Sequence, residues 1–420
     1  MNKFVQYILL SAFLFSIVAQ PRADQENRPA TGQKPIYMES HVVPIDSQKL
    51  CYLSYRVPYA NLVFVREGNS YKAGLTLRVE VTSKSRVETR ASSSDMVIVD
   101  NYDETNRRDK FLQGILKFRI STDELIINPL VELHNTGRQV PLRPFDVNSS
   151  IQEVIVVEEA TADCEKYIGY QLSNYENSIP YSDKNYQLYI PIFDSEVKQI
   201  NVVINQNDKE VVNRILEPKF TSHTHYEKCD EKIVLVNEIK GVSANIYLLN
   251  NFSYLLNEGE AELTVTDEDE NQLVKQTVNV VWVDKPISLN NSKYAYQLLE
   301  IVESEENLDT MLSEGNNDYD QALEIFWQKY DPNRETPFNQ LMYEFYSRAD
   351  KAYQKYTSTG DRFGSLTDRG KVFIKYGQPS EVDRFYTEKN EIAEVWKYQS
   401  PKMEFVFVDA SGLGNYKLIN

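Results

Sequence analysis

Short runs of alternating apolar and polar residues fill the chain from Ile36 to about residue 286, and they constrain the fold more than any other feature. These runs are rich in Val, Ile, Thr, Tyr and Phe, and turn residues separate them about every 8–12 positions. Examples are residues 50–57, 73–81 and 111–120. Since a period of two puts one face of each strand in a core and the other in water, the pattern predicts an antiparallel β-sandwich.

A second series of runs follows with the same pattern. Residues 199–203, 260–265 and 276–283 are its clearest strand candidates, and the polar segment 266–271 is predicted to be a hairpin turn. The length of each series suits one domain. The sequence therefore predicts two tandem β-sandwich domains, residues 36–160 and residues 161–286.

The apolar period changes from two to 3.6 after Pro286, which predicts helices over residues 290–358. One helix is predicted to have Thr336 as its N-cap and Pro337 in its first turn. Short strand-like runs return in residues 359–420, beginning with a predicted strand at 371–376. The expected fold class is mainly β: two β-sandwiches, then a helical segment and a small α+β unit that together span residues 287–420.

The N-terminal residues 1–19 are typical of a secretory signal peptide, with Lys3 ahead of an apolar run. The run is shorter than the roughly 20 residues that a membrane-spanning helix needs, and cleavage is expected after Ala19, or else after Ala23. Residues 20–35 are polar, contain three prolines and are predicted to be a flexible leader. We expect an exported protein, periplasmic or extracellular, that is not lipidated and is not inserted in the membrane after cleavage; an uncleaved anchor is the alternative.

Charge and cysteine content limit the partners and the compartment. The chain has 45 Lys and Arg against 62 Asp and Glu, a formal net charge of −17, which disfavours nucleic acid and anionic lipid as partners. Three cysteines are too few for a disulfide scaffold. Cys51 alternates with apolar residues and is predicted to be a buried thiol. Cys164 and Cys229 fall in the same predicted domain and could therefore form a disulfide, but the sequence does not decide whether they do.

Several linked segments near the C-terminal end resemble the GWxTD domain family of exported bacterial proteins. They are residues 326–332, 336–339, 344–348 and 364–379, and the resemblance covers about residues 295–420. Two positions depart from the family pattern: Ser365 stands where the naming tryptophan would be, and Gln378 replaces the first of a usual proline pair. The resemblance implies a protein of the bacterial envelope and no established reaction.

The segment Thr367-Asp368-Arg369-Gly370 is the most distinctive motif. One interpretation is a charged binding spot beside Tyr376, where glycines let a ligand approach the backbone. The favoured interpretation is a turn in which Gly370 takes a positive φ and a strand follows. The candidate binding residues in and around the motif are Trp327, Gly364, Thr367, Asp368, Arg369, Gly370, Tyr376, Gly377 and Pro379.

Signals for metal or covalent chemistry are weak. His223 and His225 lie near Cys229 and Asp230, which are metal-ligand residue types, but surface-loop histidines explain the same residues. The acidic segment 267–271 lacks the glycine and the final glutamate of a calcium loop. No nucleophile elbow or phosphate loop is present in the sequence, so neither a cofactor, a metal nor a catalytic residue is predicted.

Three functions are compatible with the sequence. The first is a non-enzymatic envelope protein that docks a protein partner through its β modules and its C-terminal domain. The second is a hydrolase acting on a cell-wall or exported polymer, which would need a cleft with two carboxylates, one of raised pKa. The third is carbohydrate or peptide binding by the β-sandwiches.

Overall fold

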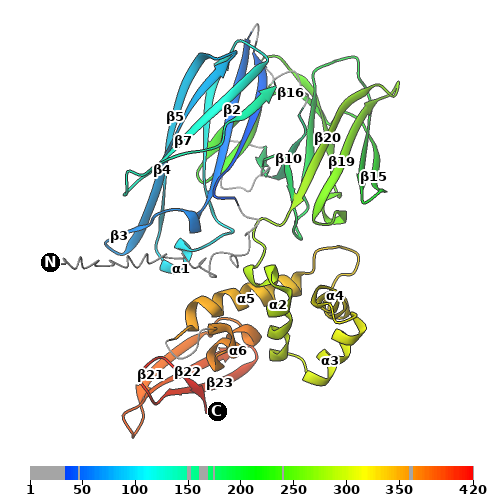
Figure 1. Cartoon of the computed structure of the whole chain (residues 1–420). Helices are drawn as coiled ribbons and strands as arrows, with labels where there is room; N and C mark the ends of the chain where they lie inside the picture. The colour runs from blue at the N-terminus through cyan, green and yellow to red at the C-terminus, as the bar shows by residue number, and fades with distance from the viewer. Residues whose placement is uncertain are drawn as a thin grey trace, which may run out of the picture.

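The computed structural model describes residues 34–45, 48–148, 153–159, 169–173, 176–238, 241–358 and 363–419. Within them the chain is mainly β and has five sheets (Figure 1). Four of the sheets form two β units, and a helical segment then leads to the fifth sheet at the C-terminal end. The predicted signal peptide and almost all of the leader lie outside the described residues and stay predictions. In the part of the chain that the structure describes, no helix is long and apolar enough to cross a membrane.

The first unit packs a three-stranded sheet against a larger one (Figure 1). In the small sheet β2 lies between β1 and β6, and all its pairs are antiparallel. In the larger sheet β4 pairs with β3, β5 and β7, while β7 also pairs with β8 and β9. The bounds are β1 Tyr37–Ile45, β2 Gln48–Pro58, β3 Val65–Glu67, β4 Ser70–Ser83, β5 Arg86–Val99, α1 Tyr102–Thr105, β6 Phe111–Ile120, β7 Glu124–Leu133, β8 Gln139–Pro141 and β9 Phe145–Asn148.

The second unit contains a closed six-stranded sheet in the order β10-β11-β17-β16-β18-β13 and a five-stranded sheet in the order β12-β20-β19-β14-β15. This region is more complex than the antiparallel β-sandwich that the sequence predicts: one sheet closes on itself, and β12 runs parallel to β20. The bounds are β10 Ile155–Glu159, β11 Tyr170–Leu172, β12 Ser178–Pro180, β13 Gln187–Ile192, β14 Ile200–Gln206, β15 Lys209–Leu216, β16 Phe220–Cys229, β17 Lys232–Glu238, β18 Ala244–Leu249, β19 Gly259–Asp267 and β20 Gln272–Val281.

Strand β2 is buried on both faces. Residues 51–58 are all buried, although the sequence alternates apolar with polar side chains there. Cys51, Leu53 and Tyr55 join the core between the two sheets of the first unit, as their spacing predicts. Tyr52, on the opposite face, joins a second core with Val43 of β1 and with strands of the closed sheet. The three-stranded sheet is therefore a layer shared by the two β units.

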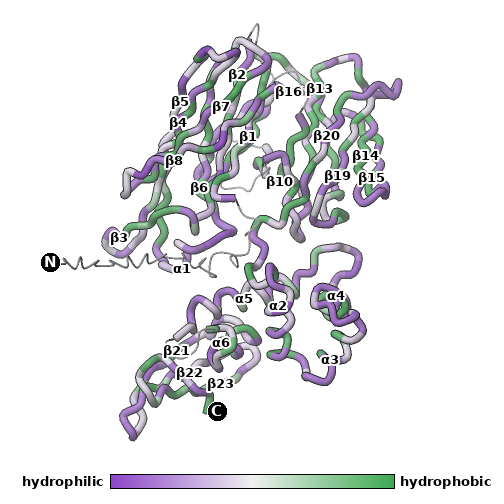
Figure 2. The backbone as a smooth tube through the Cα atoms, viewed as in Figure 1, coloured by the Kyte–Doolittle hydropathy of each residue, from purple (hydrophilic) through white to green (hydrophobic). Residues whose placement is uncertain are grey.

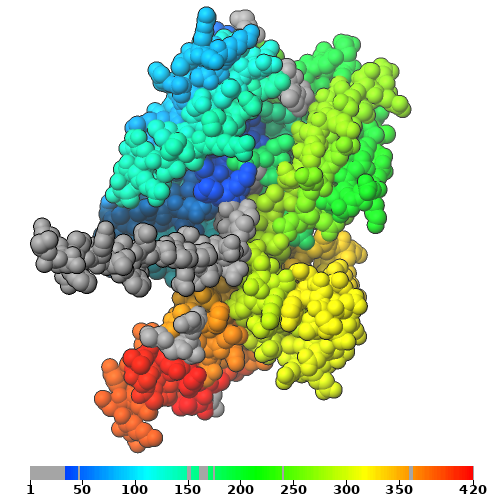
Figure 3. All heavy atoms as spheres, viewed as in Figure 1, coloured from blue at the N-terminus to red at the C-terminus, as the bar shows by residue number. Residues whose placement is uncertain are grey.

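The β part of the molecule is held by three successive cores. A third apolar cluster joins the closed sheet to the five-stranded sheet. Along most strands apolar and polar residues alternate, which places one of each pair of neighbouring side chains toward a core (Figure 2). In the space-filling view the two β units form one continuous upper mass above the helices and the C-terminal sheet (Figure 3).

The C-terminal part consists of helices followed by a four-stranded antiparallel sheet in the order β21-β22-β23-β24. Helices α2 to α5 fall where the 3.6 period predicts them, and one apolar cluster runs from α2 to the sheet. The bounds are α2 Ser292–Leu298, α3 Glu305–Glu314, α4 Tyr319–Lys329, α5 Gln340–Tyr356, α6 Asp368–Tyr376, β21 Glu381–Tyr386, β22 Ile392–Gln399, β23 Lys402–Asp409 and β24 Lys417–Leu418.

Two local predictions in this part are wrong. Helix α5 has Asn339 as its N-cap and not Thr336, because the Asn339 side chain accepts the backbone N–H of Met342 at 2.9 Å. Residues 371–376 form the body of helix α6 and not a strand. The buried run 372–374 is too short for its period to separate a strand from a helix.

An aromatic joint attaches the C-terminal part to the second β unit. The rings of Tyr181, Trp282 and Phe338 lie 5.3–5.5 Å apart from one another, and Tyr343 of α5 contacts Trp282 and Phe338. The Tyr181 hydroxyl donates a hydrogen bond of 2.6 Å to the backbone oxygen of Pro337. Edge-to-face rings add to the apolar contact, so this joint restrains the orientation of the helices.

Leu53 offers a test of the shared layer. Leu53 is fully buried in β2, so Leu53→Ala should lower the free energy of unfolding by about 2–5 kcal/mol through lost contacts and a cavity. Ile98→Ala on β5, where the side chain is 61% exposed, is the matched control and should change it by less than about 0.5 kcal/mol. Urea unfolding followed by fluorescence measures both; equal losses would contradict the assigned core.

Candidate functional site

The distinctive motif begins helix α6. A 3₁₀ turn, Gly364–Leu366, leads to Thr367, whose hydroxyl donates to the Gly364 oxygen at 2.7 Å and accepts the Gly370 N–H at 3.0 Å. Thr367 is thus an N-cap. The predicted turn with a positive φ at Gly370, followed by a strand, is wrong: Gly370 is helical, and a Cβ there would lie 2.0 Å from the Gly364 oxygen. Glycine is needed for close approach of two backbone segments.

The other motif residues near α6 tie the helix to the sheet. Asp368 accepts the backbone N–H of Leu418 in β24 at 2.8 Å. Gly377 ends α6 with a φ of +79°, and its oxygen accepts the Tyr398 hydroxyl at 3.0 Å. The Tyr376 ring lies 5.2 Å from that of Phe405 on β23, and Pro379 is buried just after the helix.

Arg369 and Glu394 form the polar centre of the C-terminal unit. The Glu394 side chain, 3% exposed, accepts hydrogen bonds from Arg369 at 3.3 Å, from Arg384 at 2.8 Å and from the indole N–H of Trp396 at 3.2 Å. The Arg369 guanidinium also stacks 3.8 Å from the centre of the Tyr416 ring. The charge of the Arg369 guanidinium pairs with Glu394, and its flat face packs on Tyr416. Since both contacts lie inside the domain, Arg369 stabilises the fold.

Trp327 and Ser365 are also internal. The Trp327 side chain is 5% exposed, and its N–H donates to the Tyr346 hydroxyl at 3.3 Å. Ser365, at the position of the naming tryptophan, is fully buried and hydrogen-bonded to Tyr294. The predicted binding residues therefore do not converge on an open site; they position α4, α5, α6 and the sheet.

The histidine pair lies on strand β16 and not in a surface loop. The His223 ring nitrogen Nδ1 lies 2.9 Å from the Val242 oxygen, and His225 Nε2 lies 3.3 Å from Glu227. Among the described residues no group of three His, Cys, Asp or Glu side chains is arranged to hold a metal ion. Asp267 uses its carboxylate to accept backbone N–H groups within its own turn.

The cysteines differ in state. Cys51 is a buried free thiol, and burial raises its pKa above the ordinary range. Cys229 is disulfide-bonded. Cys164, the partner considered from the sequence, lies outside the described residues.

A small cleft of about 110 Å³ lies where the first β unit meets α5. Burial raises the pKa of Asp284, and a hydrogen bond from Tyr343 offsets part of this rise. Burial also raises the pKa of Asp350, and hydrogen bonds from the backbone N–H groups of Ile287 and Ser288 offset part of it. Burial would raise the pKa of Asp109 too, but the Arg107 guanidinium holds it below its usual range. The acids of this cleft are already engaged by groups of the chain itself.

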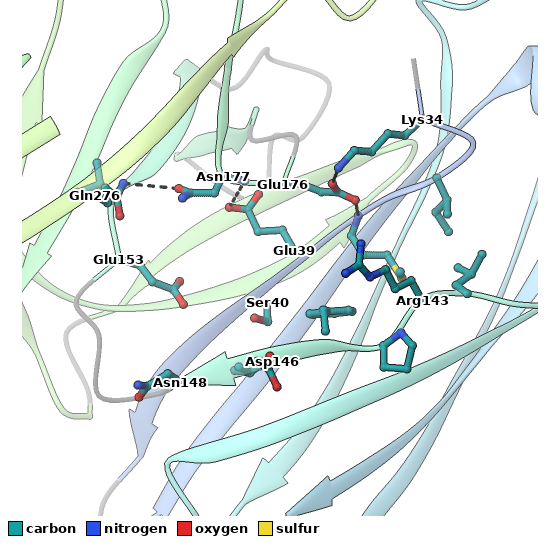
Figure 4. A pocket seen from close by; sticks show the side chains of 17 residues that line it. Lys34, Glu39, Ser40, Arg143, Asp146, Asn148, Glu153, Glu176, Asn177 and Gln276 are labelled. Atoms are coloured by element: carbon teal, nitrogen blue, oxygen red, sulfur yellow. Dashed lines mark hydrogen bonds and ion pairs between the residues drawn. The ribbon is translucent and has the colours of Figure 1, made fainter. Parts of the chain in front are cut away.

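A larger cavity of about 780 Å³, here called the seam pocket, lies between the two β units (Figure 4). Its lining comes from β1 and the residues before it, from β9 and the residues before it, from the two residues just before β10, from the loop before β12 and from Gln276 of β20. Glu39, Asp146 and Glu153 lie around the same space (Figure 4). No local motif in the sequence marks these residues, because the fold alone brings the five segments together.

A buried histidine stands behind the seam pocket. His41 is 1% exposed, its Nδ1 lies 3.1 Å from Glu153, and its ring stacks on Tyr226 of β16 at 4.6 Å. Burial alone would lower the pKa of His41. The hydrogen bond to Glu153 and the charges of Glu39 and Glu153 outweigh burial and the opposing charge of Arg56, so the pKa is raised.

Comparison with known proteins bears on the C-terminal part. A model of the GWxTD domain matches residues 248–420. This chain carries a GWxTD domain. The match begins in β18, upstream of the region that the sequence motifs indicated, so it includes β19, β20 and the Trp282 and Phe338 rings of the aromatic joint, but not Tyr181.

Other comparisons add little. A solved structure described as "Biofilm associated protein - BSP domain" is 6% identical, with a TM-score of 0.15, over 59% of this chain and 52% of that one. This chain thus spans about half the length of that structure, and a similarity so low carries no argument. No curated protein matches the chain.

Thr367 provides a test of the motif as a helix cap. Thr367→Ala removes the oxygen that accepts the Gly370 N–H and should lower the free energy of unfolding by about 1 kcal/mol. Thr367→Ser keeps that oxygen and should recover most of the loss. Urea unfolding compares the two variants; equal losses would contradict the cap.

Glu394 provides a test of the polar centre. Glu394→Gln leaves the largely buried Arg369 without its counter-charge and should cost about 3–5 kcal/mol of unfolding free energy. Arg384→Ala removes a 73% exposed partner of the same carboxylate and should cost at most about 1 kcal/mol. A ranking in the opposite order, measured by urea unfolding, would contradict this assignment.

Proposed function

We propose that the protein is an exported, non-enzymatic component of the bacterial cell envelope that docks a protein partner through the sheet of its GWxTD domain. The signal-like residues 1–19 support export to the periplasm or the exterior. The presence of the GWxTD domain supports an envelope role through the family resemblance.

The observation that carries the proposal is the exposure of strand β21. All six of its residues are exposed, and among the described strands it pairs with β22 alone. Val382, Phe385 and Tyr386 are 41%, 46% and 69% exposed. An edge strand with unpaired backbone groups and apolar side chains is a template for strand addition by another chain.

The sheet face turned away from the helices extends this surface. Phe385 lies opposite Ala393 and Asp383 lies opposite Val395, while Val395 lies opposite Val406. The partly exposed Val395 and Val406 thus continue the apolar surface beside Phe385 on a face where polar residues are usual. The partner that fits is a protein segment in extended conformation whose apolar side chains contact this row.

The rest of the molecule is suited to hold this surface in place. The β units share the three-stranded sheet, and the aromatic joint ties the helices to the second unit. Lys355 of α5 also forms an ion pair of 2.6 Å with Asp103 of α1. The proposal therefore assigns a scaffold role to residues 36–286.

Site-specific photo-crosslinking in the native envelope tests the docking surface. A photoreactive phenylalanine analogue at position 386 should give a discrete adduct with a partner protein. The same analogue at Ile215, which is 66% exposed on the edge strand β15, is the matched control and should give none. Phe385→Glu should abolish the adduct at position 386 without changing the melting temperature.

The proposal fails if positions 386 and 215 give the same adducts, or if Phe385→Glu leaves the adduct at position 386 unchanged. Amide hydrogen exchange of the purified complex adds a readout of the binding mode. Strand addition should slow exchange at the outward N–H groups of β21, whereas side-chain contact alone should not.

A hydrolase remains the second candidate because of the raised pKa of Asp284 and Asp350 in one cleft. The cleft is small for a polymer, and Asp350 accepts two backbone N–H groups. If turnover of a wall polymer were found and lost in Asp284→Asn with the fold intact, the hydrolase would replace the docking proposal.

A further inference from the structure

The seam pocket combines an apolar wall with an excess of acid. Its apolar lining includes Ile36, Met38, Phe145 and Val147. The volume of about 780 Å³ falls in the range of ligand sites, which occur preferentially at domain interfaces. Two basic and four acidic side chains line it, so it has two negative charges in excess.

Part of this charge is already neutralised within the chain. Glu176 pairs with Lys34 and accepts the Met38 N–H at 3.3 Å. Arg143 and Asp146 are exposed and form no ion pair with other described residues. Glu153 contacts His41 through one carboxylate oxygen. A cationic group entering the pocket would therefore meet Asp146 and the second oxygen of Glu153.

The pocket also borders the edge strand of a sheet. Strand β1 pairs with β2 alone among the described strands. The Met38 N–H points away from β2, toward Glu176, and in an antiparallel strand the backbone groups of Ser40 point the same way. Both residues line the pocket. The Met38 N–H is already taken by Glu176, so an extended chain along this edge would bond to the backbone of Ser40, with one side chain in the cavity.

We propose that the seam pocket binds the basic side chain, arginine or lysine, of an extended peptide. Such a side chain has an apolar stem, which suits Met38 and Phe145, and a cationic head, which suits Glu153 and Asp146. The site is independent of the β21 surface, because it is built by the two β units and not by the C-terminal sheet.

His41 couples this site to pH. Protonated His41 and the peptide cation share the carboxylate of Glu153, so each disfavours the other. The groups facing His41 are Glu39 of β1, Arg56 and Tyr52 of β2, Tyr226 of β16, and Glu153. The proton leaves His41 as the pH rises through a pKa that lies above its ordinary value, and affinity for the cation should rise with it.

Fluorescence polarisation with the purified full chain tests the site. The probe is a labelled extended peptide of alanine and valine with one central arginine, and the same peptide with neutral citrulline is its control. We expect saturable binding of the arginine peptide and a loss of about tenfold or more with citrulline. Affinity should increase from about pH 6 to about pH 8, and His41→Gln should flatten this dependence.

Variants locate the binding. Asp146→Asn removes a carboxylate without contacts to other described residues, so it should weaken binding of the arginine peptide while leaving the melting temperature unchanged. Glu153→Gln should weaken it further. Glu306→Gln on α3 removes an exposed carboxylate elsewhere and is the charge-matched control, which should bind normally.

Three results would overturn the inference. Equal affinity for the arginine and citrulline peptides would exclude recognition of charge. Equal weakening by Asp146→Asn and Glu306→Gln would place binding outside the pocket. Binding of spermidine or free arginine amide as tightly as the peptide would show a small-amine site with no peptide recognition.

Discussion

The burial of strand β2 on both faces is the constraint on which the β part of the molecule depends. One face contributes Leu53 and Tyr55 to the first core, and the other contributes Tyr52 to the core shared with the closed sheet. The polar residues on the second face need partners there, and Arg56 donates to the Leu172 oxygen while Ser54 donates to the Glu39 oxygen at 3.3 Å. Because a slip of one residue would exchange the two faces, these bonds and cores together specify the register.

The GWxTD domain depends on a comparable internal arrangement of its motif. Thr367 starts α6, Gly370 lets the helix lie against the preceding turn, and Arg369 reaches the buried carboxylate of Glu394 in the sheet. These residues specify how helix and sheet meet. In our proposal, recognition therefore falls to residues of the outer surface, where strand β21 is exposed.

Much of the fold can be predicted from local periodicity, and the failures have physical causes. The strands at 50–57, 73–81 and 111–120 follow from a period of two, and helices α2 to α5 follow from a period of 3.6. Ser54 and Arg56 look like a water-facing side of a strand, yet they are buried, because periodicity cannot tell whether a polar face meets water or another unit. The run 372–374 looks like a strand, and only the N-cap at Thr367 shows that it belongs to a helix. The seam pocket has no local signal at all, since its residues come from segments as distant as Lys34 and Gln276.

The acidic side chains of the protein have different roles in the folded structure. The Asn271 side chain donates a hydrogen bond that lowers the pKa of Asp267, and backbone N–H groups of the same turn lower it further. Hydrogen bonds from Asn307 and Tyr330 lower the pKa of Glu303 to about 2. Those carboxylates are stabilised as anions by neutral donors of the chain. Glu39 and Glu153 differ because they face a histidine, His41, whose charge depends on pH and whose pKa they raise. Arg56 faces the same histidine and offsets part of this charge, but the charge of His41 itself changes with pH, so in our proposal a proton on His41 and a bound cation compete for the Glu153 carboxylate.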